Sequence, residues 1–242
     1  MDREDHKSCT QIIVSWSGGK DAAWALHTLR ADPRYDVVGL LTTVTDEYER
    51  VAMHGIRRDV LHAQAAAVEL PLIEARLPLH ADNTTYETSF ARALASARKR
   101  WPDLRHVAFG DLFLADVRAY RDALCTRIGW DCVYPLWKSD TATLARTMID
   151  GGLRAALCCV DTQQLDASFC GRKFDDGLLR DLPATVDPCG EHGEFHTCVH
   201  AGPMFAQPLT LRRGETVLRD GRFAFTDLQI IPLPAGEGAK GG

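Results

Sequence analysis

The stretch from Ile12 to Leu29, IIVSWSGGKDAAWALHTL, constrains the fold more than any other part of the sequence. The β-branched residues at its start predict a buried strand, and the apolar spacing from Ala22 onward predicts a helix with one buried face. Gly18 and Gly19 lie between them, where the backbone must turn tightly or approach a ligand. Because a helix presents free N–H groups at its start, this unit predicts an anion-binding site.

Strand and helix patterns alternate through the first half of the chain. We expect strands at 11–17, 36–44, 71–78, 106–112 and 131–137, and helices at 20–31, 56–68, 84–101 and 119–129. This alternation predicts an α/β fold, Rossmann-like, with a five-stranded parallel sheet and helices on both faces. In such sheets ligands bind beyond the carboxyl ends of the strands.

The pattern changes near residue 135. A helix is expected at 140–151, a strand at 153–162, and two short strands at 215–220 and 222–231 joined by an Asp-Gly-Arg turn. We therefore expect a first domain over 1–134 and a smaller α+β domain over 135–233. The Gly/Pro-rich tail, 234–242, is expected to be disordered.

The net charge and the hydropathy pattern argue against two classes of function, nucleic-acid binding and membrane insertion. The formal net charge of −5 argues against a nucleic-acid binder, which usually carries a strongly basic surface. The charged N-terminal segment has no signal-peptide pattern, and no apolar run approaches the roughly 20 residues that span a bilayer. We expect a cytoplasmic protein with no membrane partner.

The glycine loop matches neither of two common nucleotide motifs. Walker A needs Ser or Thr directly after its Lys, whereas Asp21 follows Lys20 here, and the Gly-x-Gly-x-x-Gly fingerprint is absent. The loop resembles the PP-loop of the ATP pyrophosphatases, Ser-Gly-Gly-x-Asp-Ser, although Ala22 replaces the final Ser. The alternative is an ordinary strand-to-helix turn. The resemblance implies that ATP is bound, with Mg²⁺, through Ser17, Gly18, Gly19, Lys20 and Asp21.

A second dense stretch, DPCGEHGEFHTCVHAGP, covers residues 187–203. It concentrates acidic, histidine and cysteine side chains among glycines, and such a concentration seldom serves packing alone. One alternative is a zinc site, but the spacing follows no standard zinc pattern. The candidate zinc ligands are Cys189, His192, His196, Cys198 and His200.

Residues 190–197, GEHGEFHT, resemble the Gly-Glu-x-Gly-Glu-Phe-His-Thr motif of the diphthine–ammonia ligase family of PP-loop ATPases. The segments FGDL at 109–112, PLW at 135–137 and GR at 171–172 also fit this family. The resemblance implies catalytic roles for Glu191, Glu194 and His196. It also implies that Gly110 and Asp111 contact the nucleotide or its magnesium ion. We expect no metal site formed by protein ligands alone.

Two further groups of side chains fall near strand ends. His54 either lines the nucleotide site or lies on the surface, and the residues alone do not separate these alternatives. Asp116, Arg118 and Arg121 either belong to the site near the end of the strand at 106–112 or form ion pairs on an exposed helix face.

The family resemblance implies an ATP-dependent, AMP-forming ligase. A substrate carboxylate is adenylated, and ammonia or an amine then displaces AMP to leave an amide. The acceptor would be diphthine on elongation factor 2 only if the chain comes from an archaeon or a eukaryote. Two alternatives stay open: a PP-loop enzyme that modifies tRNA, and a non-enzymatic adenine-nucleotide-binding protein.

Overall fold

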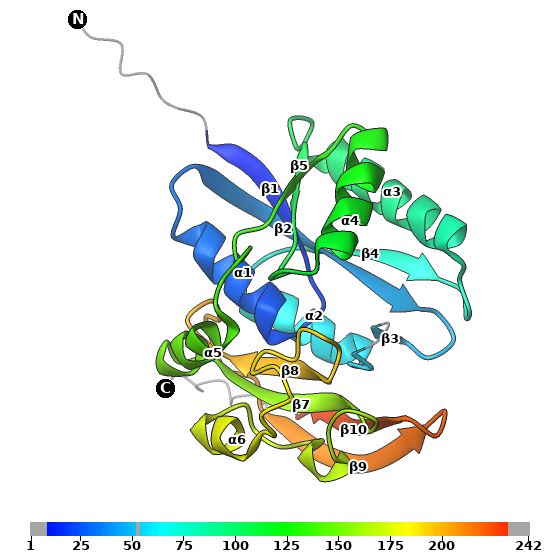
Figure 1. Cartoon of the computed structure of the whole chain (residues 1–242). Helices are drawn as coiled ribbons and strands as arrows, with labels where there is room; N and C mark the ends of the chain where they lie inside the picture. The colour runs from blue at the N-terminus through cyan, green and yellow to red at the C-terminus, as the bar shows by residue number, and fades with distance from the viewer. Residues whose placement is uncertain (1–8, 52–53, 232–242) are drawn as a thin grey trace, which may run out of the picture.

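A computed structural model describes residues 9–51 and 54–231. Two β-sheets form the framework (Figure 1). The expected disordered tail, 234–242, lies outside the described residues.

The first sheet contains the five expected parallel strands. Their order across the sheet is β4 (Leu72–Leu77), β2 (Tyr35–Thr45), β1 (Thr10–Ser15), β5 (His106–Ala108) and β6 (Asp131–Val133). A two-residue strand, β3 (Arg50–Val51), pairs antiparallel with the end of β2. The four connecting helices are α1 (Lys20–Arg30), α2 (Arg58–Ala67), α3 (Asn83–Arg100) and α4 (Ala115–Arg127).

Alternate side chains of the central strand enter two separate cores. Ile12 and Val14 belong to the core that includes α1 and α2, whereas Ile13, between them, belongs to the core that includes α3 and α4. This period of two buries β1 on both faces. The helices therefore cover both sides of the sheet, as Figure 1 shows.

The second sheet is antiparallel, with the order β8 (Phe195–Ala201), β7 (Arg154–Asp161), β10 (Phe223–Ile230) and β9 (Leu211–Arg219). Helix α5 (Thr141–Asp150) precedes it. The short elements η1 (Ala167–Phe169) and α6 (Asp176–Asp181) follow β7. One buried cluster runs from Ile12 of β1 through to Leu157 of β7, so the two sheets share a core. The proposed division at residue 134 stays a prediction.

The position of β1 locates the ligand-binding edge. β1 lies between β2 and β5, so the chain leaves it toward one side of the sheet and returns on the other. At such a switch point the loops at the carboxyl ends diverge and open a crevice. The glycine loop after β1 and residues 109–111 after β5 therefore lie on the same edge.

Some elements differ from the sequence expectation. β5 and β6 end at Ala108 and Val133, several residues early, and α4 begins at Ala115 rather than near residue 119. Pro135 has no N–H for a strand ladder, so it limits β6. Gly110 approaches the start of α1 too closely for the strand to continue: a Cβ there would lie 2.7 Å from the carbonyl carbon of Asp21. Helix α6 has too few apolar positions for its period to be recognised.

Over the described parts of the chain, no helix combines the length and the apolarity needed to cross a membrane.

Candidate functional site

The glycine loop turns sharply between β1 and α1. Gly18 has φ of +80°, a conformation that L side chains rarely adopt, and a Cβ there would lie 2.7 Å from Gln64 Oε1. Gly19 is the N-cap of α1, and its amide donates to Ser17 Oγ at 3.3 Å. The first turn of α1 therefore points into the crevice at the sheet edge, as an anion site requires.

The second sheet holds this loop from behind. The amide of Val199 in β8 donates to the carbonyl of Gly18 at 2.9 Å, and the amide of Lys20 donates to Thr197 Oγ1 at 3.0 Å. β8 thus contacts the backbone of the glycine loop on both sides of Gly19, once through its own backbone and once through the Thr197 side chain. The loop's shape depends on a strand almost 180 residues away.

Gln64, in α2, is fully buried and contacts Trp16, the glycine loop and β8. Its Nε2 donates to the carbonyls of Gly18, at 3.0 Å, and Val199, at 2.7 Å. Its Oε1 accepts a hydrogen bond from Trp16 Nε1 at 3.0 Å. Every polar atom of this side chain is therefore satisfied by the loop or by β8, which makes Gln64 a positioning residue for the loop.

A cavity of about 780 Å³, called here the main cavity, lies at this edge. The glycine loop, the segment after β5 and the 190–197 motif line it together, so residues far apart in sequence meet in one site. This volume suits a nucleotide-sized ligand. Of the expected site residues, the lining includes Ser17, Lys20, Asp21, His54, Gly110, Asp111, Glu191 and His196.

Lys20 is placed differently from a free phosphate-binding cation. Its side chain is only 2% exposed, and Nζ donates to Asp21 Oδ2 at 2.9 Å and to the carbonyl of Cys189. The ring centroids of Phe195 and Phe174 lie 5.5 and 5.8 Å away. Burial favours loss of the proton, but the negative groups around Nζ, Asp21 foremost, together outweigh it and raise the pKa of Lys20. The ammonium thus ties α1 to the 190–197 segment.

Asp21 and Asp111 supply carboxylate oxygens to the main cavity. Asp21 Oδ1 and Asp111 Oδ2 are buried and accept no hydrogen bond among the described residues. Burial raises the pKa of Asp111, the Arg121 guanidinium opposes this, and the nearby Asp21 adds to it. Two buried carboxylates beside the glycine loop, one with an oxygen that accepts no hydrogen bond and one paired with Arg121, suit Mg²⁺, which takes one or two carboxylates together with phosphate oxygens.

The side chain of Glu191 extends from the 190–197 motif to the segment after β5. Its Oε1 accepts from the amides of Leu112 and Phe113 at 3.0 and 3.3 Å. Burial raises the pKa of Glu191, although these two hydrogen bonds oppose the rise. A carboxylate with a raised pKa is a better proton acceptor near neutral pH than an ordinary glutamate.

Glu194 does not share this position. It is 1% exposed, and its two oxygens accept from the amides of Asp187 and His192, each at 2.9 Å. The carboxylate closes the 187–193 loop on itself, and Glu194 is absent from the described lining of the main cavity. Its contacts give it a positioning role, and the catalytic role expected from the sequence stays a prediction.

His54 lies in the cavity wall rather than on an outer surface. Its ring centroid lies 4.4 Å from that of His196. Burial, followed by the nearby Lys20 ammonium, lowers the pKa of His196 to about 4. His196 is therefore neutral at pH 7, which suits a hydrogen-bonding role better than that of a cation.

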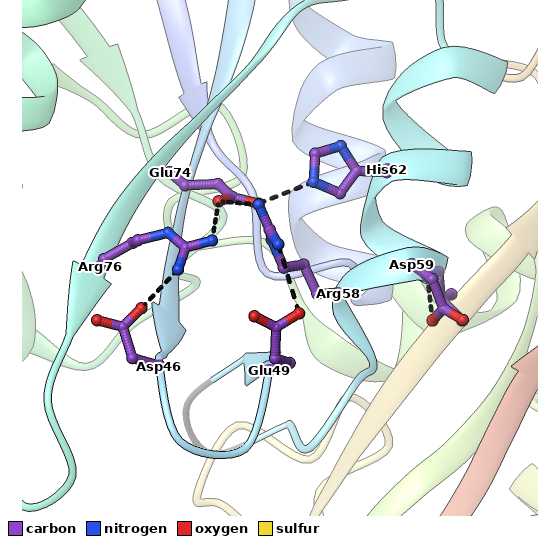
Figure 2. Close-up of polar contacts among 8 residues, drawn as sticks. Asp46, Glu49, Arg58, Asp59, His62, Glu74 and Arg76 are labelled. Atoms are coloured by element: carbon purple, nitrogen blue, oxygen red, sulfur yellow. Dashed lines mark hydrogen bonds and ion pairs between the residues drawn. The ribbon is translucent and has the colours of Figure 1, made fainter.

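An ion-pair network supports the loop that carries His54. Glu74 of β4 accepts from Arg58 Nε at 2.7 Å and Nη2 at 3.0 Å, and lies 2.8 Å from His62 Nε2 (Figure 2). Burial alone would raise the pKa of Glu74, but the hydrogen bonds from Arg58 and His62 outweigh it and lower the pKa. On the other side, Asp227 of β10 pairs with Arg50 and Arg57 at 2.8 and 2.7 Å. Arg50 and Arg57, on either side of His54, thus share one carboxylate of the second sheet, whereas Arg58 pairs with the first sheet.

The zinc alternative finds no supporting geometry. Within 9–51 and 54–231, no three His, Cys, Asp or Glu side chains gather in a metal-binding arrangement. Cys189 Sγ is directed to the carbonyl of Thr141 at 3.4 Å, and Gln64 Nε2 donates to Cys198 Sγ at 3.8 Å.

The sequence did not single out Gln64 or Arg222, which the structure places at the site. Gln64 is one polar position in an alanine-rich helix. Of the three residues named from the sequence near the strand at 106–112, Arg121 lines the main cavity, and its Nε lies 2.9 Å from Asp111 Oδ2. Arg222 forms a bidentate pair with the buried Asp161 at the far rim. The expected helix-face pair does occur at Arg118, whose Nε lies 3.5 Å from Asp122 Oδ2.

Comparisons with known proteins cover nearly all of this architecture. The family model for the diphthamide synthase N-terminal domain matches residues 10–132, and that for the diphthamide synthase C-terminal domain matches residues 140–225. A diphthine–ammonia ligase of Schizosaccharomyces pombe (strain 972 / ATCC 24843) is 26% identical over 225 residues. That similarity takes in 86% of this chain but 37% of the yeast protein, so the chain spans well under half of this relative.

Proposed function

The chain belongs to the diphthamide synthase family, and we propose from this premise that it is an ATP-dependent, AMP-forming ligase that joins ammonia or an amine to a carboxylate. The observation that supports this proposal best is the main cavity, where the glycine loop and the 190–197 motif face each other. An anion site and a cluster of proton-accepting side chains in one cavity match the two halves of such a reaction.

The proposed chemistry has two steps. An oxygen of the acceptor carboxylate attacks the α-phosphorus of ATP, the bond to the β-phosphate breaks, and pyrophosphate leaves. The nitrogen of ammonia then attacks the carbonyl carbon of the acyl-adenylate, AMP leaves, and an amide remains. Adenylation is needed because a free carboxylate is a poor electrophile.

The glycine loop would hold the β- and γ-phosphates together. Ser17, Gly18 and Gly19 would form the turn around them, and the positive end of the α1 dipole would face them; the Lys20 amide is already used by Thr197 Oγ1. Gripping both phosphates leaves the α-phosphorus as the reacting atom. Lys20 would act through the position of Asp21 as well as through its charge.

Asp21 and Asp111 would hold Mg²⁺, because Asp21 has a buried oxygen that accepts no hydrogen bond and Asp111 lies near it, with its own carboxylate paired to Arg121. The ion would supply charge neutralisation for the phosphates. Gly110 would allow Asp111 to reach this point, since its missing side chain lets the two segments approach.

Glu191 would take the proton that the ammonia nitrogen loses as it bonds to the carbonyl carbon, because its raised pKa suits a general base. His196, neutral at pH 7, would orient the adenylate, and His54 would complete the same wall. Glu194 would act by fixing the 187–193 loop, and so the position of Glu191.

Family membership gives only the chemical class of the acceptor carboxylate. The yeast relative is named for diphthine, and a diphthine-type carboxylate is the proposed acceptor for this chain if its source makes that residue. Such a ligase would act in the cytoplasm, where ATP and elongation factors are present.

The test measures whether AMP release depends on both the carboxylate and ammonia. The protein would be incubated with ATP, Mg²⁺, ammonium chloride and a panel of carboxylates, and nucleotides and amides would be separated by chromatography. We expect AMP in equal amounts with an amide, and only slow AMP release when either partner is left out. AMP release that no carboxylate accelerates would argue against a ligase.

A further inference from the structure

The two edges of the second sheet differ in what lies beside them. At the β8 edge, the amide of Val199 donates to the carbonyl of Gly18, so the glycine loop closes that side. At the other edge, β9 has β10 as its single strand neighbour among the described residues, and it lies on the side of the sheet away from the glycine loop (Figure 1). Because N–H and C=O groups alternate in direction along a strand, half of those of β9 point away from β10 and have no strand to pair with.

β9 carries few of the features with which proteins protect such an edge. Protected edge strands are usually very short or contain Pro or Lys. β9 is nine residues long and contains neither. Val217 and Leu218 are 42% and 59% exposed, although both are large apolar side chains. A long edge strand with exposed apolar side chains is a template for pairing with another strand.

One irregularity limits where that pairing can occur. The register of β9 against β10 shifts between Thr226 and Leu228, which places a bulge at Gly214 and Glu215. A bulge bends its strand and interrupts regular pairing. The regular part of the free edge is therefore 215–219, Glu-Thr-Val-Leu-Arg, between the bulge and the hairpin turn.

We propose that this edge pairs with the same edge of a second copy of the chain, antiparallel about a two-fold axis at Val217, so that two second sheets join into one. A two-fold contact uses the same surface on both copies. In this direction 215–219 is complementary to itself, because Glu215 of each copy lies opposite Arg219 of the other. Opposite charges across a strand pair stabilise it, whereas a parallel alignment would place like charges beside each other.

The two charged side chains are available for this contact. Over the described chain, the side chains of Glu215 and Arg219 take part in no ion pair and no hydrogen bond. The guanidinium carbon of Arg219 lies 5.7 Å from the centroid of the Tyr48 ring and 5.8 Å from that of Phe225. Residues two apart in a strand point to the same side, so Glu215, Val217 and Arg219 share one face of the proposed contact.

The hairpin that carries this edge also forms part of the site. Arg222 and Phe223, directly after the turn, line the main cavity. Asp227 of β10 pairs with Arg50 and Arg57. A dimer through β9 would therefore connect the two main cavities through the hairpins that form one wall of each. The inference does not depend on the ligase reaction.

The test is sedimentation equilibrium of the full chain over a wide range of protein concentration. We expect a concentration-dependent species of twice the chain mass of 26.8 kDa. Glu215→Arg and Arg219→Glu each place like charges opposite one another at both ends of the contact, so each should weaken dimerisation at least tenfold. The matched control, Asp103→Arg, reverses an exposed charge between α3 and β5 and should leave dimerisation unchanged.

Mixing the two weakened variants tests the register itself. In a heterodimer of Glu215→Arg with Arg219→Glu, both positions of one copy are arginine and both positions of the other are glutamate, so opposite charges face each other again. We expect the mixture to dimerise within about threefold of the wild-type affinity, although each variant alone does not. A variant that failed to fold could not give this result.

Three results would overturn the inference. A wild-type chain that stays monomeric at every concentration would exclude the dimer. A dimer that both single variants leave intact would place the contact elsewhere on the molecule. A mixture of the two variants that sediments as monomers would exclude the antiparallel register. Product analysis with ATP tests the proposed ligase function separately, so the two failures are distinguishable.

Discussion

The amide of Lys20 donates a hydrogen bond of 3.0 Å to Thr197 Oγ1, across 177 positions of sequence. Lys20 begins the helix after the glycine loop, and Thr197 ends the 190–197 motif. Each half of the proposed site is therefore part of the other's structure. ATP affinity and the position of the motif should change together when this connection is disturbed.

Gln64→Leu should weaken ATP binding tenfold or more, about 1.4 kcal/mol. The substitution removes the hydrogen bonds to the Gly18 and Val199 carbonyls and leaves buried Trp16 Nε1 without its acceptor, at a cost of about 1–3 kcal/mol in unfolding free energy. Calorimetric titration with ATP and urea unfolding would measure both effects.

The matched control is Gln207→Leu, at an exposed glutamine. It should change neither quantity. An unchanged ATP affinity for Gln64→Leu, in protein that remains folded, would show that Gln64 supports the core and not the loop.

Asp21→Asn should lower ATP affinity at least tenfold when Mg²⁺ is present and much less when it is chelated. The reason is that the carboxylate has a buried oxygen free to take the ion, and an amide is a poorer ligand for it. Titrations of ATP with and without Mg²⁺ would separate these effects. Asp59→Asn, at an exposed position in the first turn of α2, is the control; equal losses in both conditions would remove the proposed metal role of Asp21.

Glu191→Gln should impair amide formation, whereas Glu194→Gln should lower the stability of the fold. The glutamine at 191 can still accept from the Leu112 amide, so the fold should persist while amide formation falls about a hundredfold or more. The glutamine at 194 places an NH₂ group against one of two backbone donors, so stability should fall by about 1–3 kcal/mol. Rates under acceptor-saturated conditions and unfolding midpoints would measure the two; equal stability losses would contradict the separate roles.

The sequence predicts the glycine loop better than it predicts the other residues that line the main cavity. The β-branched strand, the paired glycines and the helix period locate residues 17–21 without coordinates, because each is a local signal. Gln64 carries no such signal, because its role comes from Val199, 135 positions away, which only the folded chain brings near. Glu194 differs, because its partners are local: its place in a polar motif predicts chemistry, yet both of its oxygens accept from the backbone amides of Asp187 and His192.

Stability should fall as the pH drops from about 6.5 to 4, in part because of His196. Its pKa is about 4 in the folded chain against 6.5 without burial, so over that range the unfolded chain binds a proton that the folded chain does not. Above pH 6.5 both states are neutral there and the contribution disappears. In His196→Gln the loss of unfolding free energy between pH 7 and pH 4.5 should be smaller by about 1–2 kcal/mol.

Denaturant unfolding of both proteins at the two pH values is the measurement. His200, whose pKa is also lowered by burial, is common to both and cancels in the comparison. The same loss in both proteins would mean that His196 is solvated in the native state.

The central claim is that the loop from Ser17 to Asp21 grips the β- and γ-phosphates as a unit, so that ATP is cleaved at the α-phosphorus. The most direct test is chromatography of the nucleotides formed from ATP and Mg²⁺, which needs no knowledge of the acceptor because slow hydrolysis yields the same products. The account predicts AMP and pyrophosphate, and their loss in Asp21→Asn. ADP and phosphate as the main products would contradict it.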